Sequence, residues 1–158
     1  MRVLAVDPGT KRLGLSISDL SGTIANPLTV IEHVSRQVDA ATIAAQAKEN
    51  QAELIVVGQS IDEEGQPTQE GKRSSRLAAA IRGQISLPVV LWDEADSTQT
   101  ALTARRALGS PRRKRRGHLD DLAATVILQS YLDAHRKAGA EASSDYPPSQ
   151  PILDDRIV

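Results

Sequence analysis

Three acidic positions stand where predicted elements of secondary structure end or begin, and carboxylates in such places can bind divalent metal ions. Asp7 follows a short apolar run, Asp93-Glu94 follows another, and Asp120-Asp121 opens an amphipathic helical stretch. Several carboxylates without cysteine or a paired histidine suit a hard cation, Mg²⁺ or Mn²⁺. Two such ions can promote hydrolysis of a phosphodiester, one by activating water and the other by stabilising the leaving oxygen.

The same carboxylates also have structural interpretations. Asp7 precedes a Pro-Gly turn, where aspartate often accepts backbone N–H bonds, and acidic residues in a first helical turn favour the helix dipole. On a helical wheel, Asp120 lies about 40° from the centre of the apolar face, whereas Asp121 lies about 140° away. We therefore expect Asp120 to lean toward the sheet, where it needs a cationic partner, and Asp121 to face solvent.

Basic residues are concentrated just before the third acidic position. Seven of the 19 Lys and Arg residues fall between residues 105 and 116, although the net charge of the chain is only −1. Two groups of basic residues are candidates for contacts with nucleic-acid phosphates. The first is Lys11 with Arg12, beside Asp7, and the second is the run of Arg112, Arg113, Lys114, Arg115 and Arg116. The alternative for the run is a solvated linker. His118, just after the run, either assists at the site or is an exposed loop residue.

The composition limits the class of protein. A length of 158 residues, 40% of them hydrophobic and 25% charged, suits one domain with a proper core. The absence of cysteine excludes disulfides, Cys-ligated zinc, iron–sulfur clusters and thiol catalysis. We see no signal peptide and no long apolar stretch, so we expect a cytoplasmic protein without a membrane partner.

The predicted elements form an α/β pattern that would bring the three acidic positions together. Three meandering strands followed by helix–strand alternation predict a mixed five-stranded sheet with helices on both faces. Pro27 lies within the third strand, which favours an edge position or a bulge. Residues 1–137 would form the domain, and residues 138–158 a polar, mobile tail. The expected strands are residues 3–6, 13–17, 23–32, 52–58 and 87–92, and the expected helices are residues 35–51, 68–85, 97–108 and 119–136.

Four motifs resemble the YqgF/RuvX family, whose members are described as pre-16S rRNA nucleases and as Holliday-junction-resolvase-like proteins. The resemblance covers residues 1 to about 135, and the first motif matches almost residue for residue. It implies a ribonuclease H-like fold, with strand order 3-2-1-4-5 and strand 2 antiparallel. The motifs are DPGTKRLGLSISD (7–19), LIVVG (54–58), LPVVLWDE (87–94) with Ser97-Thr98, and HLDDLAATVILQSYL (118–132).

The resemblance also implies a site and an activity. Asp7, Glu94 and Asp120 would hold Mg²⁺ or Mn²⁺, with two ions expected, and would cleave structured nucleic acid. The implied substrate is the 5′ end of the small-subunit ribosomal RNA precursor. Resolution of four-way DNA junctions is the weaker alternative, because a shared fold does not fix function. The partner would thus be RNA or branched DNA, and we expect a monomer or a weak homodimer.

The chain departs from the family pattern at two places. Gln59-Ser60 stand where the family usually has Leu-Pro, and Ala95 and Asp96 stand where it usually has Arg and an apolar residue. The missing Arg removes a phosphate contact or a local salt bridge, and the added Asp96 could help hold a metal or repel phosphate. These departures favour a second hypothesis, a non-catalytic nucleic-acid-binding module.

A third hypothesis is the phosphate-binding lobe of a sugar kinase or actin-like ATPase, because Asp-x-Gly-Thr also opens that superfamily. Those proteins close two lobes over the nucleotide. A chain of 158 residues provides one, so this hypothesis is the weakest of the three.

Overall fold

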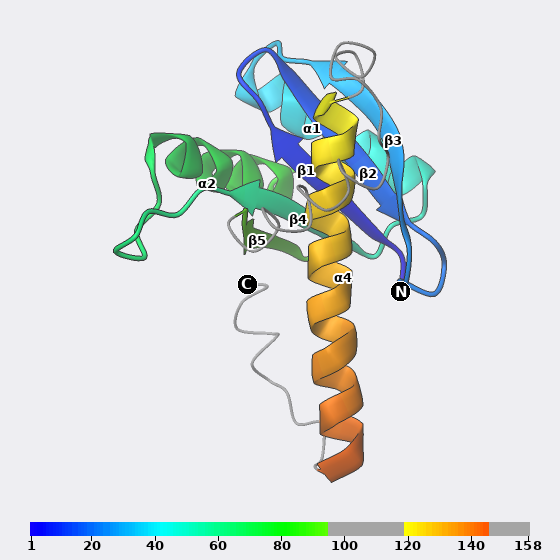
Figure 1. Cartoon of the computed structure of the whole chain (residues 1–158). Helices are drawn as coiled ribbons and strands as arrows, with labels where there is room; N and C mark the ends of the chain where they lie inside the picture. Colours follow the sequence, from blue (N-terminus) through cyan, green and yellow to red (C-terminus); the bar gives the residue numbers. More distant parts are fainter. Residues whose placement is uncertain (95–118, 146–158) are drawn as a thin grey trace.

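A five-stranded sheet forms the centre of the computed structural model, which describes residues 1–94 and 119–145 (Figure 1). The strand order is β3-β2-β1-β4-β5, with β2 antiparallel to both neighbours and β1, β4 and β5 mutually parallel. The order and the antiparallel second strand confirm the prediction. The strands are β1 (Val3–Pro8), β2 (Arg12–Ser18), β3 (Ala25–Glu32), β4 (Leu54–Gln59) and β5 (Val89–Asp93).

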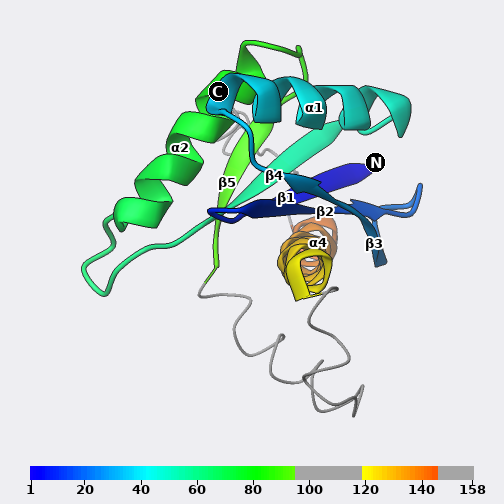
Figure 2. The same cartoon turned by 90° about the horizontal axis from the view of Figure 1, so that it is seen from above.

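Helices cover both faces of the sheet, so the molecule has three layers (Figure 2). Two helices, α1 (Arg36–Glu49) and α2 (Gln69–Arg82), lie on one face, and α4 (Leu119–Asp145) lies on the other. Within α4, side chains are described for residues 122–136. None of the described helices is both long and apolar enough to cross a membrane.

The helix starts follow from capping residues. The Ser35 hydroxyl accepts a hydrogen bond from the backbone N–H of Val38, 3.2 Å away, and so closes the first turn of α1. Thr68 does the same for α2, accepting from Gly71 N–H at 3.1 Å. The carboxyl-terminal end of α4 differs from the prediction. The helix continues to Asp145, past the predicted end near Arg136. It therefore includes residues 138–145, which composition alone assigns to the tail.

The sheet has apolar residues on both faces because helices cover both. Along β1, Leu4 and Val6 pack toward α1 and α2, whereas Val3 and Ala5 pack toward α4. The same alternation continues along β4 and β5. A strand buried on both faces reads as one continuous apolar run, which is why the central strands could be found in the sequence.

Pro27 lies in the outer strand β3, as predicted. It pairs with Ser16 of β2, and the register between the two strands shifts between Leu15 and Ser16. The missing N–H of proline is tolerated there because the strand is at the edge and the ladder is already irregular.

Polar contacts hold α4 in place on the sheet. The buried Ser16 hydroxyl donates to the Ala124 carbonyl at 2.8 Å. The Gln129 side chain bonds the chain just before and at the start of β3, accepting from Ala25 N–H at 2.9 Å and donating to the Thr23 carbonyl at 3.0 Å. These bonds determine how far along the sheet the helix lies.

A further bond joins α4 to β5. The Trp92 indole N–H donates to the Ser130 hydroxyl at 3.2 Å. The Trp92 ring also meets Tyr131 edge to face, with ring centroids 5.3 Å apart. Trp92 is therefore part of the packing between β5 and α4.

The predicted helix at residues 97–108 and the basic run lie outside the described residues.

Replacing Ser16 with Ala tests whether this anchor matters. We expect the free energy of unfolding to fall by about 1 kcal/mol, the usual net value of a hydrogen bond, with an unchanged dependence on urea. Urea denaturation followed by circular dichroism measures it. Ser86→Ala is the matched control, because Ser86 is exposed and makes no hydrogen bond among the described residues. Equal stability of Ser16→Ala and wild type would show that the anchor contributes nothing.

Candidate metal centre

Asp7 lies near the carboxyl end of β1, half-buried. Alternation along the strand places it on the α4 face, which it shares with Val3 and Ala5. Its partner across the antiparallel pair is Gly14 of β2. The neighbouring position on that side therefore carries no side chain.

Gly58 of β4 lies on the other side of Asp7. Val6 pairs with Val57, so the next position along both strands brings Gly58 beside Asp7. A Cβ at Gly58 would lie 2.8 Å from Cδ1 of Ile127 and 3.2 Å from Oε1 of Glu94. The Glu94 carboxylate thus extends over Gly58, on the face covered by α4. Asp7 and Glu94 share this face, with the side-chain-free position between their strands.

Glu94 follows directly after β5. Its backbone N–H donates to the Gln59 carbonyl at 2.8 Å, which extends the β4–β5 ladder by one residue. Burial of the side chain raises the pKa of Glu94, and the negative charges of Glu70 and Asp93 raise it further. The folded protein therefore holds a proton on Glu94 more tightly than the unfolded chain does.

The raised pKa of Glu94 has a consequence for metal binding. As pH rises through the raised pKa, ionised Glu94 costs the metal-free protein stability. A bound divalent cation would offset that cost, because its positive charge favours the ionised form of the Glu94 carboxyl group. Oxygen donors with excess negative charge are what Mg²⁺ and Mn²⁺ bind, so the residues present fit such an ion.

The third predicted ligand, Asp120, lies in the first turn of α4, but its side chain is outside the described part of the chain. The direction of the helix is known from its contacts. Ala124 meets Ser16 and Gln129 meets the start of β3, so the helix begins toward the carboxyl end of β1. Position 120 is also two turns before Ile127 on the same stripe of the helix. Among the side chains that the structure describes, those of residues 1–94 and 122–136, no three acidic, His or Cys groups form a metal-binding cluster.

Of the basic residues predicted to contact phosphates, two lie in the described part of the chain and the rest lie outside it. Lys11 and Arg12 are exposed beside the turn that follows Asp7. That turn is tight, since a Cβ at Gly9 would lie 2.2 Å from the Arg12 carbonyl oxygen. The run from Arg112 to Arg116 lies outside the described residues, as do His118, Ala95 and Asp96.

One departure from the family pattern has a structural explanation. The Gln59 side chain faces α2, on the opposite side of the sheet from Asp7. Its amide donates to the Gly71 carbonyl at 3.1 Å and to the Ser75 hydroxyl at 2.7 Å. Gln59 therefore connects β4 to α2 and leaves the carboxylate face unchanged.

The sequence analysis missed Gly14 and Gly58 as site residues. Following the alternation of faces along the strands from Asp7 and Val57 would have found them.

Comparison of the sequence with known proteins gives a consistent result. Residues 1–134 match the family model described as "RuvX: Holliday junction resolvase". A protein of Geobacillus kaustophilus named "Putative pre-16S rRNA nuclease" is 41% identical over 138 residues, which cover 86% of this chain and all of that one. A protein of the same name from Syntrophus aciditrophicus is 37% identical over 134 residues, covering 85% and 89%.

Solved structures with a similar fold include two resolvases. Thermus thermophilus RuvC in complex with a Holliday junction substrate superposes with a TM-score of 0.61 at 17% identity, covering 87% of this chain and 96% of that one. The fowlpox virus resolvase in complex with Holliday junction DNA superposes with a TM-score of 0.51 at 12% identity, covering 85% and 98%. At these identities the likeness shows the fold.

Replacing Gly58 with Ala tests whether the absence of a side chain at this position serves a metal. The new Cβ would press on Ile127 Cδ1 and Glu94 Oε1, which are the ends of flexible side chains, so the protein should still fold. Displacement of Glu94 should weaken Mn²⁺ binding roughly 10–100-fold, as measured by the electron paramagnetic resonance signal of free Mn²⁺.

Gly83→Ala is the control for that substitution. A Cβ at Gly83 would lie 3.4 Å from the nearest atom, the Ala80 carbonyl oxygen, at the end of α2 and away from the carboxylates. It should leave Mn²⁺ binding unchanged. If Gly58→Ala also left Mn²⁺ affinity unchanged while lowering stability, Gly58 would serve packing alone.

Proposed function

The chain belongs to the RuvX family, and from that membership we propose that it is a metal-dependent nuclease that hydrolyses phosphodiester bonds of structured nucleic acid. One observation carries the proposal. Asp7 and the Glu94 carboxylate lie on the same face of the sheet, beside Gly58, which has no side chain. Carboxylates at the ends of β1 and β5, the parallel strands on either side of β4, lie at the edge where α/β sheets bind ligands.

In this proposal Asp7, Glu94 and Asp120 bind Mg²⁺ or Mn²⁺, with two ions at the complete site. The chemistry that bound ions supply is activation of water and stabilisation of the leaving oxygen. The protein's own part is to hold the carboxylates in place. Hydrogen bonds of the sheet position Asp7 and Glu94, and the contacts of α4 with β2 and β3 position its first turn.

The proposed substrate is the precursor of 16S rRNA, cut at its 5′ end. The name carried by relatives at 32–41% identity favours it. The second candidate, resolution of four-way DNA junctions, is favoured by the description of the family model. We rank it lower because the two resolvase complexes named above share the fold at only 17% and 12% identity. A cytoplasmic location and a monomeric or weakly dimeric state are part of the proposal.

Replacing Asp7 with Asn tests the nuclease. The shape is preserved while the charge that would hold the metal is lost, so cleavage of a labelled 16S precursor in Mn²⁺ should fall to background with little change in folding. Cleavage by wild type should also stop in EDTA. A four-way DNA junction assayed in parallel separates the two substrates.

Glu63→Gln is the matched control, because Glu63 is an exposed loop carboxylate outside the proposed site. It should cleave like wild type. Cleavage that persists in Asp7→Asn or in EDTA would contradict the proposal, and a wild type that binds RNA without any metal-dependent product would favour the non-catalytic module.

Lys11, Arg12 and the run of residues 112–116 are proposed to contact phosphates, and the run has a separate test. Changing Arg112, Arg113, Arg115 and Arg116 to Gln should weaken RNA binding and lower the magnitude of the slope of log affinity against log salt. Each lost phosphate contact should lower it by about 0.7–0.9. Mn²⁺ affinity should stay at the wild-type value. Unchanged affinity and slope would identify the run as a solvated linker.

A further inference from the structure

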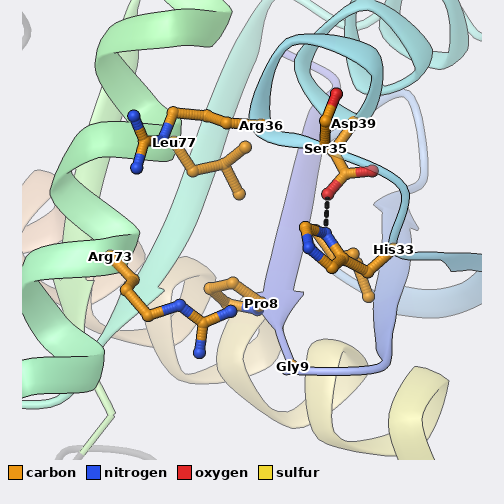
Figure 3. Close-up of a pocket in the computed structure, with 9 residues that line it drawn as sticks. Pro8, Gly9, His33, Ser35, Arg36, Asp39, Arg73 and Leu77 are labelled. Atoms are coloured by element: carbon orange, nitrogen blue, oxygen red, sulfur yellow. Dashed lines mark hydrogen bonds and ion pairs between the residues drawn. The ribbon is translucent and has the colours of Figure 1, made fainter.

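A cavity of about 250 Å³ lies on the face of the sheet opposite Asp7 and Glu94 (Figure 3). Its walls come from the turn after β1, the loop after β3, and the helices α1 and α2. Two arginines line it, Arg36 from the first position of α1 and Arg73 from the second turn of α2. Figure 3 shows Arg73 reaching toward Pro8, while Arg36 extends over Leu77.

The guanidinium groups of Arg36 and Arg73 are exposed, and neither has a partner in the part of the chain that the structure describes. No hydrogen bond or ion pair joins either side chain to another described residue. Two positive charges that face one cavity repel each other, and an anion between them would remove that repulsion. The planar guanidinium also matches the oxygens of a phosphate, to which it can donate two bonds at once.

The one carboxylate that lines the cavity is already engaged. Asp39 is buried, and its Oδ2 lies 2.5 Å from Nδ1 of His33. Its Oδ1 accepts a hydrogen bond from the backbone N–H of Val34 at 3.0 Å. Both oxygens of Asp39 therefore have partners. The guanidinium groups of the two arginines are the cationic donors at the cavity, and the start of α1 adds its partial positive charge.

The cavity and the carboxylates lie at the same end of the sheet. Pro8 and Gly9 line the cavity and directly follow Asp7, which faces the other side. A nucleic-acid strand that crosses the turn after β1 would therefore have the carboxylates on one side and the arginines on the other. Exposed Lys11 and Arg12 lie along that path.

From these observations we propose that the cavity between Arg36 and Arg73 binds one phosphate group of the nucleic-acid backbone and so positions the strand for cleavage on the other face. The inference rests on the proposed nuclease function. Arg36 and Arg73 are positioning residues here, because they contact the strand away from the reacting phosphate. Free inorganic phosphate offers the same chemistry, so the experiment must separate the two sources.

The test is the double variant Arg36→Gln/Arg73→Gln. Its matched control is Lys48→Gln/Arg76→Gln, which removes the same charge from the same two helices at exposed residues that do not line the cavity. Binding to a fluorescein-labelled 16S precursor stem and to a four-way DNA junction is measured by anisotropy at several salt concentrations. EDTA is present so that no cleavage occurs.

We expect the double variant to bind roughly tenfold more weakly than the control. We also expect its salt slope to fall in magnitude by about 0.7–0.9, the value for one phosphate. Folding and Mn²⁺ affinity should match wild type. Single phosphates of the probe are then replaced by uncharged methylphosphonates. At one position the replacement should weaken wild type and the control but leave the double variant unaffected.

Three results would overturn the inference. Equal affinity and slope for the double variant and its control would do so while leaving the nuclease proposal intact, provided that wild type cleaves in Mn²⁺. Inorganic phosphate that binds wild type but not the double variant in calorimetry, with unchanged nucleic-acid binding, would identify a site for free anions instead. A wild type that binds neither probe would overturn both proposals.

Discussion

The hydrogen bond from the buried Ser16 hydroxyl to the Ala124 carbonyl is the contact on which the proposed site most depends. The ladders of the sheet already determine where Asp7 and Glu94 lie relative to each other. They do not determine the position of α4, which packs through apolar side chains that would tolerate a slide along the strands. A directional bond one turn after position 120 prevents that slide, because a donor has good geometry with one carbonyl at a time.

The site combines this rigid frame with an unfavourable concentration of charge. Glu94 is half-buried beside Asp93 and near Glu70, and the pKa of Glu94 is raised as a result. Gly14 and Gly58 leave the surrounding positions without side chains. Under the proposed function, this concentration of carboxylates exchanges stability for the ability to bind a cation, which is a common trade at functional sites.

Much of the architecture could be predicted from the sequence, and the reasons are physical. Strands buried on both faces read as apolar runs, and Ser35 and Thr68 marked the helix starts. The strand order came from the family resemblance. The neighbours of each carboxylate at the site could not be predicted without the register in which the strands pair. Only when Val6 is known to pair with Val57 does Gly58 fall beside Asp7. The cavity between Arg36 and Arg73 could not be foreseen, since it depends on how two helices lie side by side.

Trp92 gives the molecule a consequence of practical value. It is the single tryptophan of the chain, it stands two residues before Glu94, and its indole N–H is bonded to Ser130 of α4. The intrinsic fluorescence of the protein therefore comes from one ring placed between the fifth strand and the long helix. A change in how the helix sits on the sheet, or in the charge held at the neighbouring carboxylates, would alter the emission of that ring. The fold thus contains its own optical probe, without any label.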